Sequence, residues 1–317
     1  MRIHLAHITN PVNAEPSSAF YAIQQITFES IRNAKRFSLS TTFPKFETLE
    51  KFTHDKEIDL YTTQFPEDRT IIPQDFTVLD DLQRSVLDIA KFENERKLPF
   101  IQDILSAVAK ASDTDYFIYT NMDIGLMPSF YETIFREIEA GHDAMLITRR
   151  RVSKHYNSVS QLPEIYADTG KPHPGYDTFV FHRSLLKKFV LSEICVGIPF
   201  LEVSLLHNLI AFSQNLKLID RAHLTFHIGM EVMPPVDAQF YWHNRNTYEK
   251  KILPFLKPFL TKEKFPYASE NFISRWTKWL LNPCYRSALM AEMETMSFSR
   301  KVKFLLDEIR WKIIQGD

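Results

Sequence analysis

The sequence predicts an α/β fold, in which a mixed β-sheet is flanked by helices and followed by a helical C-terminal extension. Short apolar, β-branched or aromatic runs, typical of buried strands, alternate with longer segments whose apolar residues recur at helical spacing. Beyond residue 250 only the helical spacing continues. We therefore expect two parts: residues 1–245 with the sheet, and residues 246–317 with helices.

Composition narrows the class of protein. The chain of 317 residues is 44% hydrophobic, so it can bury a large core, and its net charge of −1 gives no overall attraction to nucleic acid. Two cysteines, Cys195 and Cys284, are too few for a disulfide framework, which favours a reducing, cytoplasmic compartment. The N-terminus lacks the apolar core of a secretory signal, and no stretch is long and apolar enough to span a bilayer.

The N-terminal elements begin with a strand at residues 3–9, where apolar and polar side chains alternate until Asn10-Pro11 breaks the pattern. An amphipathic helix follows at residues 20–37, with basic residues in its last turn, as the helix dipole prefers. Three further strands are predicted at residues 38–43, 59–63 and 76–79, and two helices at residues 82–92 and 100–111.

The central stretch, residues 113–128, reads DTDYFIYTNMDIGLMP. Residues 116–120 form an aromatic and β-branched strand that ends in the polar tip Asn121-Met122-Asp123. Ligands of open α/β sheets bind at the carboxyl ends of the strands, and Mg²⁺ and Mn²⁺ prefer oxygen ligands that they share with phosphates. The tip therefore suits a cation and a diphosphate. The alternative is that Asp123 only caps the following turn or helix.

The second half of the sheet region continues the alternation. Helices are predicted at residues 129–140, 183–189 and 201–212, and strands at residues 144–148, 175–181 and 216–226. Residues 152–174 show no clear period, and we interpret them as a mobile lid or acceptor loop.

Three adjacent arginines follow the strand predicted at residues 144–148. Neighbouring residues on an extended chain point in opposite directions, so only Arg149 or Arg151 is expected to face a ligand site. A guanidinium group there suits a phosphate or a carboxylate.

Taken in order, residues 1–245 resemble the GT-A type nucleotide-sugar glycosyltransferases of the family 2 kind, which have a Rossmann-like sheet. The residues that carry the resemblance are the first strand and helix, Arg96-Lys97-Leu98-Pro99 before a helix, the Asn-x-Asp tip, and two later segments, Gly175–Phe181 and His227-Ile228-Gly229. The chain departs from the acidic DxD motif of that family, because Asn121 stands in place of the first acid.

The resemblance implies a nucleotide-sugar donor, a hydroxyl acceptor and a divalent cofactor, Mn²⁺ or Mg²⁺. It implies that Asp123 and His227 bind the metal, with Asn121 and Asp123 beside the diphosphate. The imidazole would favour manganese. It also implies that Arg96 meets the diphosphate and that Asn10 contacts the nucleotide, although a solvated charge run and a simple turn residue are the structural alternatives.

Two acids are candidates for activating the acceptor hydroxyl. Glu202 lies in the first turn of the helix predicted at residues 201–212, where the helix N-terminus already stabilises a carboxylate. The resemblance implies that an acid at this place acts as general base, which requires hydrogen-bond reach of the nucleophile. Asp177, at the mouth of the strand predicted at residues 175–181, is the other candidate. If neither acts, a retaining mechanism stays open.

Two other functions remain as alternatives. A sugar-phosphate nucleotidyltransferase usually has a basic, glycine-rich loop, and residues 8–18 contain no Gly, Lys or Arg. A non-catalytic nucleotide- or sugar-binding protein with a decayed site is the other alternative, and Asn121 is the residue that favours it.

The C-terminal part also suggests partners. An apolar stripe on residues 299–314 suits packing on the sheet domain, a homo-oligomer contact, or peripheral contact with the inner face of a membrane.

Overall fold

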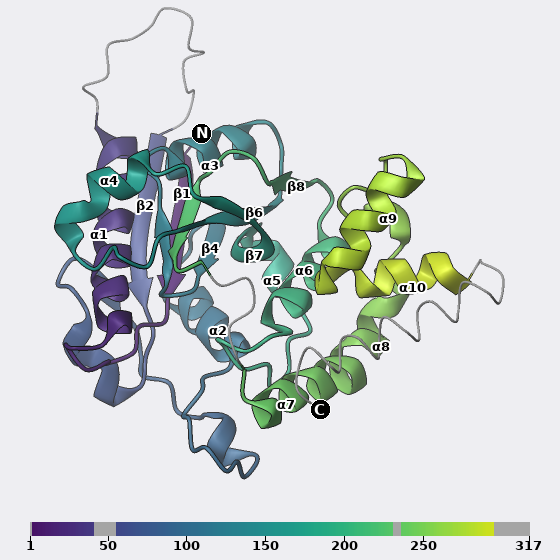
Figure 1. Ribbon diagram of the computed structural model, residues 1–317, viewed down its shortest axis with the longest axis horizontal. Helices are drawn as coiled ribbons and strands as arrows, with labels where there is room; N and C mark the ends of the chain where they lie inside the picture. Colours follow the sequence, from purple (N-terminus) through teal and green to yellow (C-terminus); the bar gives the residue numbers. More distant parts are fainter. Residues whose placement is uncertain (1, 41–54, 231–235, 295–317) are drawn as a thin grey trace, which may run out of the picture.

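The computed structural model of the chain describes residues 2–40, 55–230 and 236–294. It contains a mixed sheet with helices on both faces, so the predicted α/β class is confirmed (Figure 1). The strand order is β3-β2-β1-β4-β7-β6-β9-β5, and β8 pairs with β6. The strands are β1 Arg2–Thr9, β2 Asp55–Thr62, β3 Thr77–Val78, β4 Tyr116–Thr120, β5 Ile124–Leu126, β6 Ala144–Val152, β7 Lys171–His182, β8 Leu216–Ile219 and β9 Thr225–Ile228.

Strand direction divides the sheet into two halves. Strands β3, β2, β1 and β4 are parallel, so their carboxyl ends meet at one edge, whereas β7 runs antiparallel between β4 and β6. The α-helices are α1 Ala19–Leu39, α2 Ile101–Ala111, α3 Phe130–Glu139, α4 Leu162–Ala167, α5 Arg183–Leu186, α6 Leu201–Phe212, α7 Ala238–Thr247, α8 Leu253–Leu256, α9 Phe272–Leu281 and α10 Arg286–Glu294.

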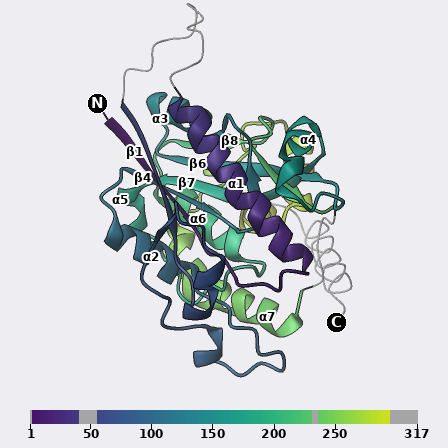
Figure 2. The same cartoon turned by 90° about the vertical axis from the view of Figure 1, so that its left-hand side faces the viewer.

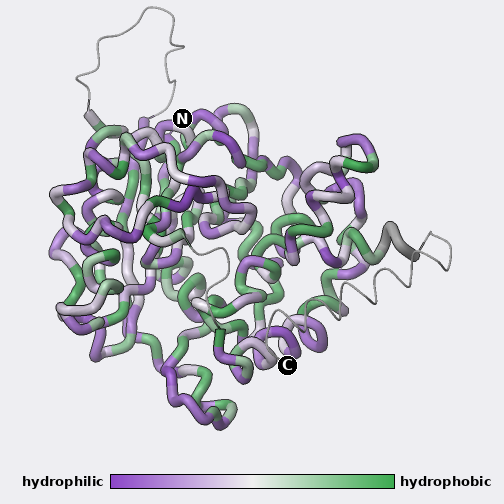
Figure 3. The backbone as a smooth tube through the Cα atoms, viewed as in Figure 1, coloured by the Kyte–Doolittle hydropathy of each residue, from purple (hydrophilic) through white to green (hydrophobic). Residues whose placement is uncertain are grey.

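The core has two layers because successive strand side chains point to opposite faces of the sheet. In β1, Leu5 packs with residues of α1 and α3, whereas Ala6 and Ile8 pack with residues of α2 and α6. Figure 2 shows α1 crossing the first of these faces, and Figure 3 shows hydrophobic residues along the strands that both layers cover. Helices thus pack on both faces of the sheet. A ligand site is therefore expected at the carboxyl ends of the parallel strands.

The C-terminal helices pack on the same face as α2 and α6. Tyr248, Ile252, Trp279 and Tyr285 belong to the hydrophobic cluster that contains those helices. The predicted division at residue 245 lies inside α7, and the division into two domains stays a prediction. Among the described residues, no helix has the length and hydropathy needed to cross a membrane.

Four sequence predictions were wrong in detail, beginning with a strand and a helix. Residues 38 and 39 end α1 instead of opening a strand, because the helical hydrogen bonds continue until the N–H of Ser40 donates to the carbonyl oxygen of Arg36; the rest of that predicted strand, from residue 41, lies outside the described residues. The helix predicted at residues 82–92 is reduced to the 3-10 turn Val86–Asp88. Its first residues instead bond to the loop after β2, where Leu82 N donates to the carbonyl oxygen of Gln64.

The other two errors concern the second half of the sheet. The loop predicted at residues 152–174 contains the turn Val159–Gln161 and α4, and β7 already begins at Lys171. The strand predicted at residues 216–226 is two strands, β8 and β9, which separate at a turn where His223 has a positive φ of 48°. The amphipathic stripe at residues 299–314 lies outside the described residues.

Candidate active site

The Asn-x-Asp tip is formed where β4 ends at the carboxyl edge of the sheet. After Thr120 the chain turns, with Ile124 N donating to the carbonyl oxygen of Asn121 at 3.1 Å, and the buried Met122 anchors the turn in the core. The chain then enters β5, which pairs antiparallel with β9. Ile124 is the register partner of His227, so Asp123 is delivered beside that histidine.

Asp123 and His227 form a direct pair. Nε2 of His227 lies 3.2 Å from Oδ2 of Asp123, and their side chains are 20% and 32% exposed, respectively. Burial raises the pKa of Asp123, but the hydrogen bond from His227 and the positive charges of His227 and Arg149 outweigh it, so the pKa lies below its usual value. The carboxyl group is therefore ionised at neutral pH.

The pair also leaves polar atoms unused. Among the described residues, Oδ1 of Asp123 and Nδ1 of His227 are buried and make no hydrogen bond. Buried polar atoms normally have a partner, so such atoms need an explanation. The two atoms that face each other, Oδ2 of Asp123 and Nε2 of His227, are 3.2 Å apart, a separation that also fits two ligands of one divalent ion at about 2.0–2.2 Å each. The mixed donor set suits Mn²⁺ better than Mg²⁺.

Arg149, Asp177 and Glu202 lie close to this pair. Arg149 forms an ion pair with Asp177, and both side chains are nearly buried, at 12% and 14% exposure. Burial, with the negative charge of Asp177, raises the pKa of Glu202 to about 7. The charge of Arg149 acts on both Glu202 and Asp123. The structure thus brings together four of the predicted site residues, Asp123, His227, Asp177 and Glu202.

Glu202 is held in the first turn of α6, as predicted. The helix begins after Phe200, whose backbone has a φ of 77°, a left-handed conformation that is costly for a residue with a bulky side chain. Strain of this kind of order 1–3 kcal/mol persists only where the surrounding structure enforces it, and it concentrates at functional sites.

The three arginines separate by side-chain direction within β6. Arg149 faces Asp177, whereas Nη2 of Arg150 donates to the carbonyl oxygen of Ile165 at 2.9 Å. Nη1 of Arg151 donates to the carbonyl oxygen of Met230 at 2.6 Å. Of the two arginines considered from the sequence, Arg149 therefore lies in the site, whereas Arg151 hydrogen-bonds to the backbone after β9. Nε of Arg149 is buried without a hydrogen-bond partner among the described residues.

Asn121 takes its orientation from a residue that the sequence interpretation counted only as core. The hydroxyl of Tyr119 donates to Oδ1 of Asn121 at 2.8 Å. Burial, together with the negative charges of Asp123 and Asp177, raises the pKa of Tyr119, so its phenol stays protonated as a donor. The sequence did contain a signal for this contact: Tyr119 is a strand residue with a polar hydroxyl, two positions before Asn121.

Asn10 and Arg96 stand apart from this group. Nδ2 of Asn10 donates to the carbonyl oxygen of Thr63 at 2.6 Å, which ties the ends of β1 and β2 together. Arg96 is exposed, and its guanidinium carbon lies 6.0 Å from the ring centroid of Phe240. No contact described for these two residues joins either one to Asp123, and their roles at a nucleotide stay predictions.

The fold and the site together define an α/β protein with an ionised carboxylate, an imidazole and a partly protonated acid gathered at one edge of its sheet. No family model matches the sequence, and a search of curated proteins finds no match.

Solved structures of glycosyltransferases are distantly similar. Staphylococcus aureus TarS residues 1–349 in complex with UDP-GlcNAc has a TM-score of 0.46 at 10% identity, covering 88% of this chain and 79% of TarS. The mannosyltransferase PcManGT of Pyrobaculum calidifontis, in complex with GDP-Man and Mn²⁺, has a TM-score of 0.46 at 10% identity, covering 100% of this chain and 85% of its own.

A third similar structure is the glucosyl-3-phosphoglycerate synthase of Mycobacterium tuberculosis with Mn²⁺, UDP-glucose and phosphoglyceric acid. Its TM-score is 0.41 at 10% identity, with 80% of each chain covered. At these TM-scores and identities the likeness carries no argument about donor, metal or acceptor, so the case for function depends on the residues of this chain.

Proposed function

We propose that this chain is a metal-assisted glycosyltransferase that moves a sugar from a nucleoside-diphosphate sugar to a hydroxyl acceptor. The observation that carries the proposal is the pair of Asp123 and His227 beyond the carboxyl end of β4: its facing atoms are spaced for one ion, and one oxygen of Asp123 has no hydrogen bond among the described residues. The resemblance of the chain order to GT-A type enzymes supplies the reaction class.

The donor half of the site would use Asp123, His227 and Arg149. Asp123 and His227 would hold Mn²⁺ or Mg²⁺, and Asn121 would lie beside the diphosphate. When bound, such an ion neutralises the charge that develops on the leaving diphosphate. Arg149 adds a fixed positive charge next to Asp123, and its buried Nε is available as a further donor to a phosphate oxygen.

The acceptor half would use Glu202 and Asp177 in different roles. A general base works best when its pKa is near the operating pH, and the pKa of Glu202 is raised to about 7. Glu202 would accept the proton of the attacking hydroxyl. Asp177 is occupied by Arg149, so it would orient that arginine and keep the pKa of Glu202 high.

Nucleotide binding tests the proposal. Calorimetric titration with UDP and GDP, each with and without Mn²⁺, should show binding that Mn²⁺ strengthens in the wild type and not in Asp123→Ala. A screen of nucleotide sugars for donor hydrolysis then identifies the sugar. Nucleotide binding without hydrolysis or transfer would favour the non-catalytic alternative, and no binding in any condition would overturn the proposal.

The C-terminal helices are proposed as a peripheral contact surface. Phe255, Ile273 and Leu281 are 65%, 76% and 71% exposed, so α8 and α9 present large apolar side chains to solvent. Contact with an anionic membrane and contact with a second copy of the chain give different outcomes. Co-sedimentation with anionic vesicles supports the first, and a dimeric mass in solution supports the second. A chain that is monomeric in solution and does not co-sediment with anionic vesicles would contradict both.

A further inference from the structure

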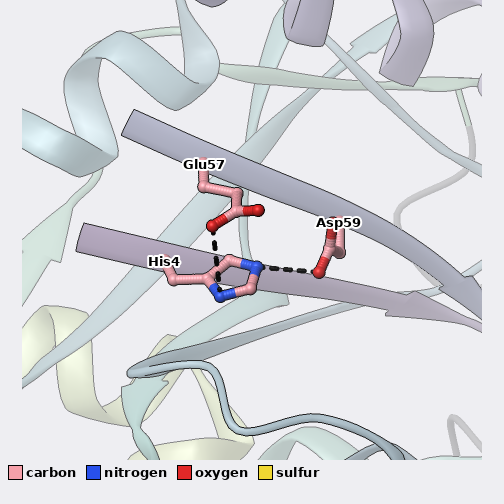
Figure 4. Close-up of side chains that lie close together, drawn as sticks. All are labelled: His4, Glu57 and Asp59. Atoms are coloured by element: carbon pink, nitrogen blue, oxygen red, sulfur yellow. Dashed lines mark hydrogen bonds and ion pairs between the residues drawn. The ribbon is translucent and has the colours of Figure 1, made fainter. Parts of the chain in front are cut away.

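A second group of metal-binding side chains lies on strands β1 and β2. His4 and Glu57 are opposite each other in the parallel register, and Asp59 follows two residues along β2. Side chains at such positions share one face of a sheet. Figure 4 shows the ring of His4 between the two carboxylates. Its Nε2 lies 2.7 Å from Oδ2 of Asp59, and its Nδ1 lies 3.6 Å from Oε2 of Glu57.

This group is separate from the candidate active site. His4 precedes Thr9, the last residue of β1, by five positions, which at about 3.3 Å per residue is roughly 17 Å along the strand. The candidate active site lies at the carboxyl edge of the sheet, whereas the group of His4 lies toward the opposite edge. The three side chains are 24–35% exposed, so an ion can reach them from solvent.

Neighbouring residues hold the three side chains in place. The backbone of His4 bonds to Asp115 in both directions: His4 N donates to Oδ2 of Asp115, and Asp115 N donates to the carbonyl oxygen of His4, each at 3.0 Å. The hydroxyl of Tyr61 donates to Oδ2 of Asp59 at 3.2 Å. Supporting hydrogen bonds of this kind orient metal ligands and raise affinity.

Glu57 is incompletely satisfied. Its Oε2 is buried and makes no hydrogen bond among the described residues, although Arg2 forms an ion pair with it. The side chain of Arg2 is 63% exposed, so the pair is screened by solvent and contributes little. An ion that bound Glu57 would compete with a weak partner.

We propose that His4, Glu57 and Asp59 bind a divalent transition metal of the zinc type, which joins β1 to β2. One imidazole nitrogen and two carboxylate oxygens suit Zn²⁺, at about 2.0–2.2 Å each, with water in the fourth position. Mg²⁺ and Ca²⁺ prefer oxygen ligands alone. One ligand atom from each of the three residues lies within 4.8 Å of the others. The carboxylates face different nitrogens of His4, so binding one ion requires the exposed imidazole or one carboxylate to rotate until both acids meet the same nitrogen.

Zinc titration of the full chain tests this proposal. Calorimetry should find one more zinc site in the wild type than in His4→Gln or Asp59→Asn. His142→Gln is the matched control, because His142 faces a single carboxylate, Glu137, at 3.6 Å. This control should keep the wild-type stoichiometry. An ion that binds only the folded chain stabilises it, so Zn²⁺ should raise the Tm more in wild type and His142→Gln than in His4→Gln.

If His4→Gln does not fold by circular dichroism, Glu57→Gln takes its place. Equal zinc stoichiometry and equal Tm shifts in wild type and in the folded variants at this site would overturn the proposal. So would a wild type that binds no Zn²⁺.

Discussion

Two histidines of this chain, His207 in α6 and His227 in β9, show how differently polar groups are used in its interior. The ring of His207 is 1% exposed, and both of its nitrogens have partners: the hydroxyl of Tyr248 and, at 3.0 Å, the carbonyl oxygen of Cys284. Burial lowers the pKa of His207 to about 4, so it is neutral at pH 7. His227 instead faces a carboxylate with Nε2, and its Nδ1 has no hydrogen-bond partner in the part of the chain that the structure describes.

This difference in hydrogen bonding distinguishes a histidine that stabilises the fold from one that can bind a ligand. A buried group whose hydrogen bonds are complete stabilises the fold, and removing it leaves its partners unsatisfied. A group that is held in place yet incomplete has capacity for a ligand. His207 joins α6 to the C-terminal helices. His227, Asp123 and Arg149 instead each have a buried polar atom with no hydrogen bond to any described residue, at one place on the sheet edge.

The largest effect is expected where the negative charge of Asp123 is removed. Asp123→Asn keeps the shape of the side chain but removes its charge, so sugar transfer should fall about 100-fold or more, the scale seen when one electrostatic contact to a developing charge is lost. Measured kcat at saturating Mn²⁺ and donor checks this. The free energy of unfolding should change by no more than about 1 kcal/mol, because the carboxylate is partly solvated.

Two outcomes would break the comparison at Asp123. Full transfer by Asp123→Asn would show that the negative charge of Asp123 is not needed to hold an ion. A large loss of stability, with transfer per folded molecule unchanged, would make Asp123 and His227 a structural pair like the partners of His207.

The second prediction compares two single variants, in which His207 or His227 is replaced by leucine. His207→Leu should lower the free energy of unfolding by about 3 kcal/mol, because it leaves the hydroxyl of Tyr248 and a carbonyl oxygen buried without partners. His227→Leu should cost about 1 kcal/mol or less and weaken Mn²⁺ binding instead. Urea denaturation and Mn²⁺ titration of both variants check this. Equal losses of stability would contradict it.

Local patterns in the sequence were enough for most elements and for the tip of β4. The run at residues 116–120 and the polar residues after it are adjacent in the chain, so their order alone predicts a strand that ends in Asn121 and Asp123. The helix at residues 201–212 was predicted with its bounds unchanged, because its apolar residues and its first-turn acid are local signals as well.

The remaining features depend on contacts between distant segments. The ion pair of Arg149 and Asp177 depends on the register of β6 against β7, where a bulge shifts the pairing near Thr148. The group of His4, Glu57 and Asp59 depends on the register of β1 against β2, which are separated in the chain by α1. Residues 82–92 have helical spacing, yet Leu82 bonds to Gln64 instead. No local pattern contains such information.

The smallest effect concerns Glu202, whose pKa is raised because its carboxyl group is buried near the negative charge of Asp177. A carboxyl group with a pKa of about 7 in the folded chain and 4.5 in the unfolded chain keeps its proton longer when folded. Its contribution to stability is therefore complete below pH 4.5 and is lost as the pH rises to about 7. Across this window the loss should be about 2 kcal/mol, after allowance for partial exposure.

Glu202→Gln removes that titration. Urea denaturation at pH 5 and pH 8 should show that stability falls more in the wild type than in the variant, by about 2 kcal/mol. Asp177→Asn is the matched second variant: it removes the neighbouring negative charge, so the wild-type slope should shrink without vanishing. Parallel pH profiles for wild type and Glu202→Gln would mean that Glu202 ionises like a surface acid. It would then be a carboxylate of ordinary basicity, and the argument for it as the base from its raised pKa would be lost.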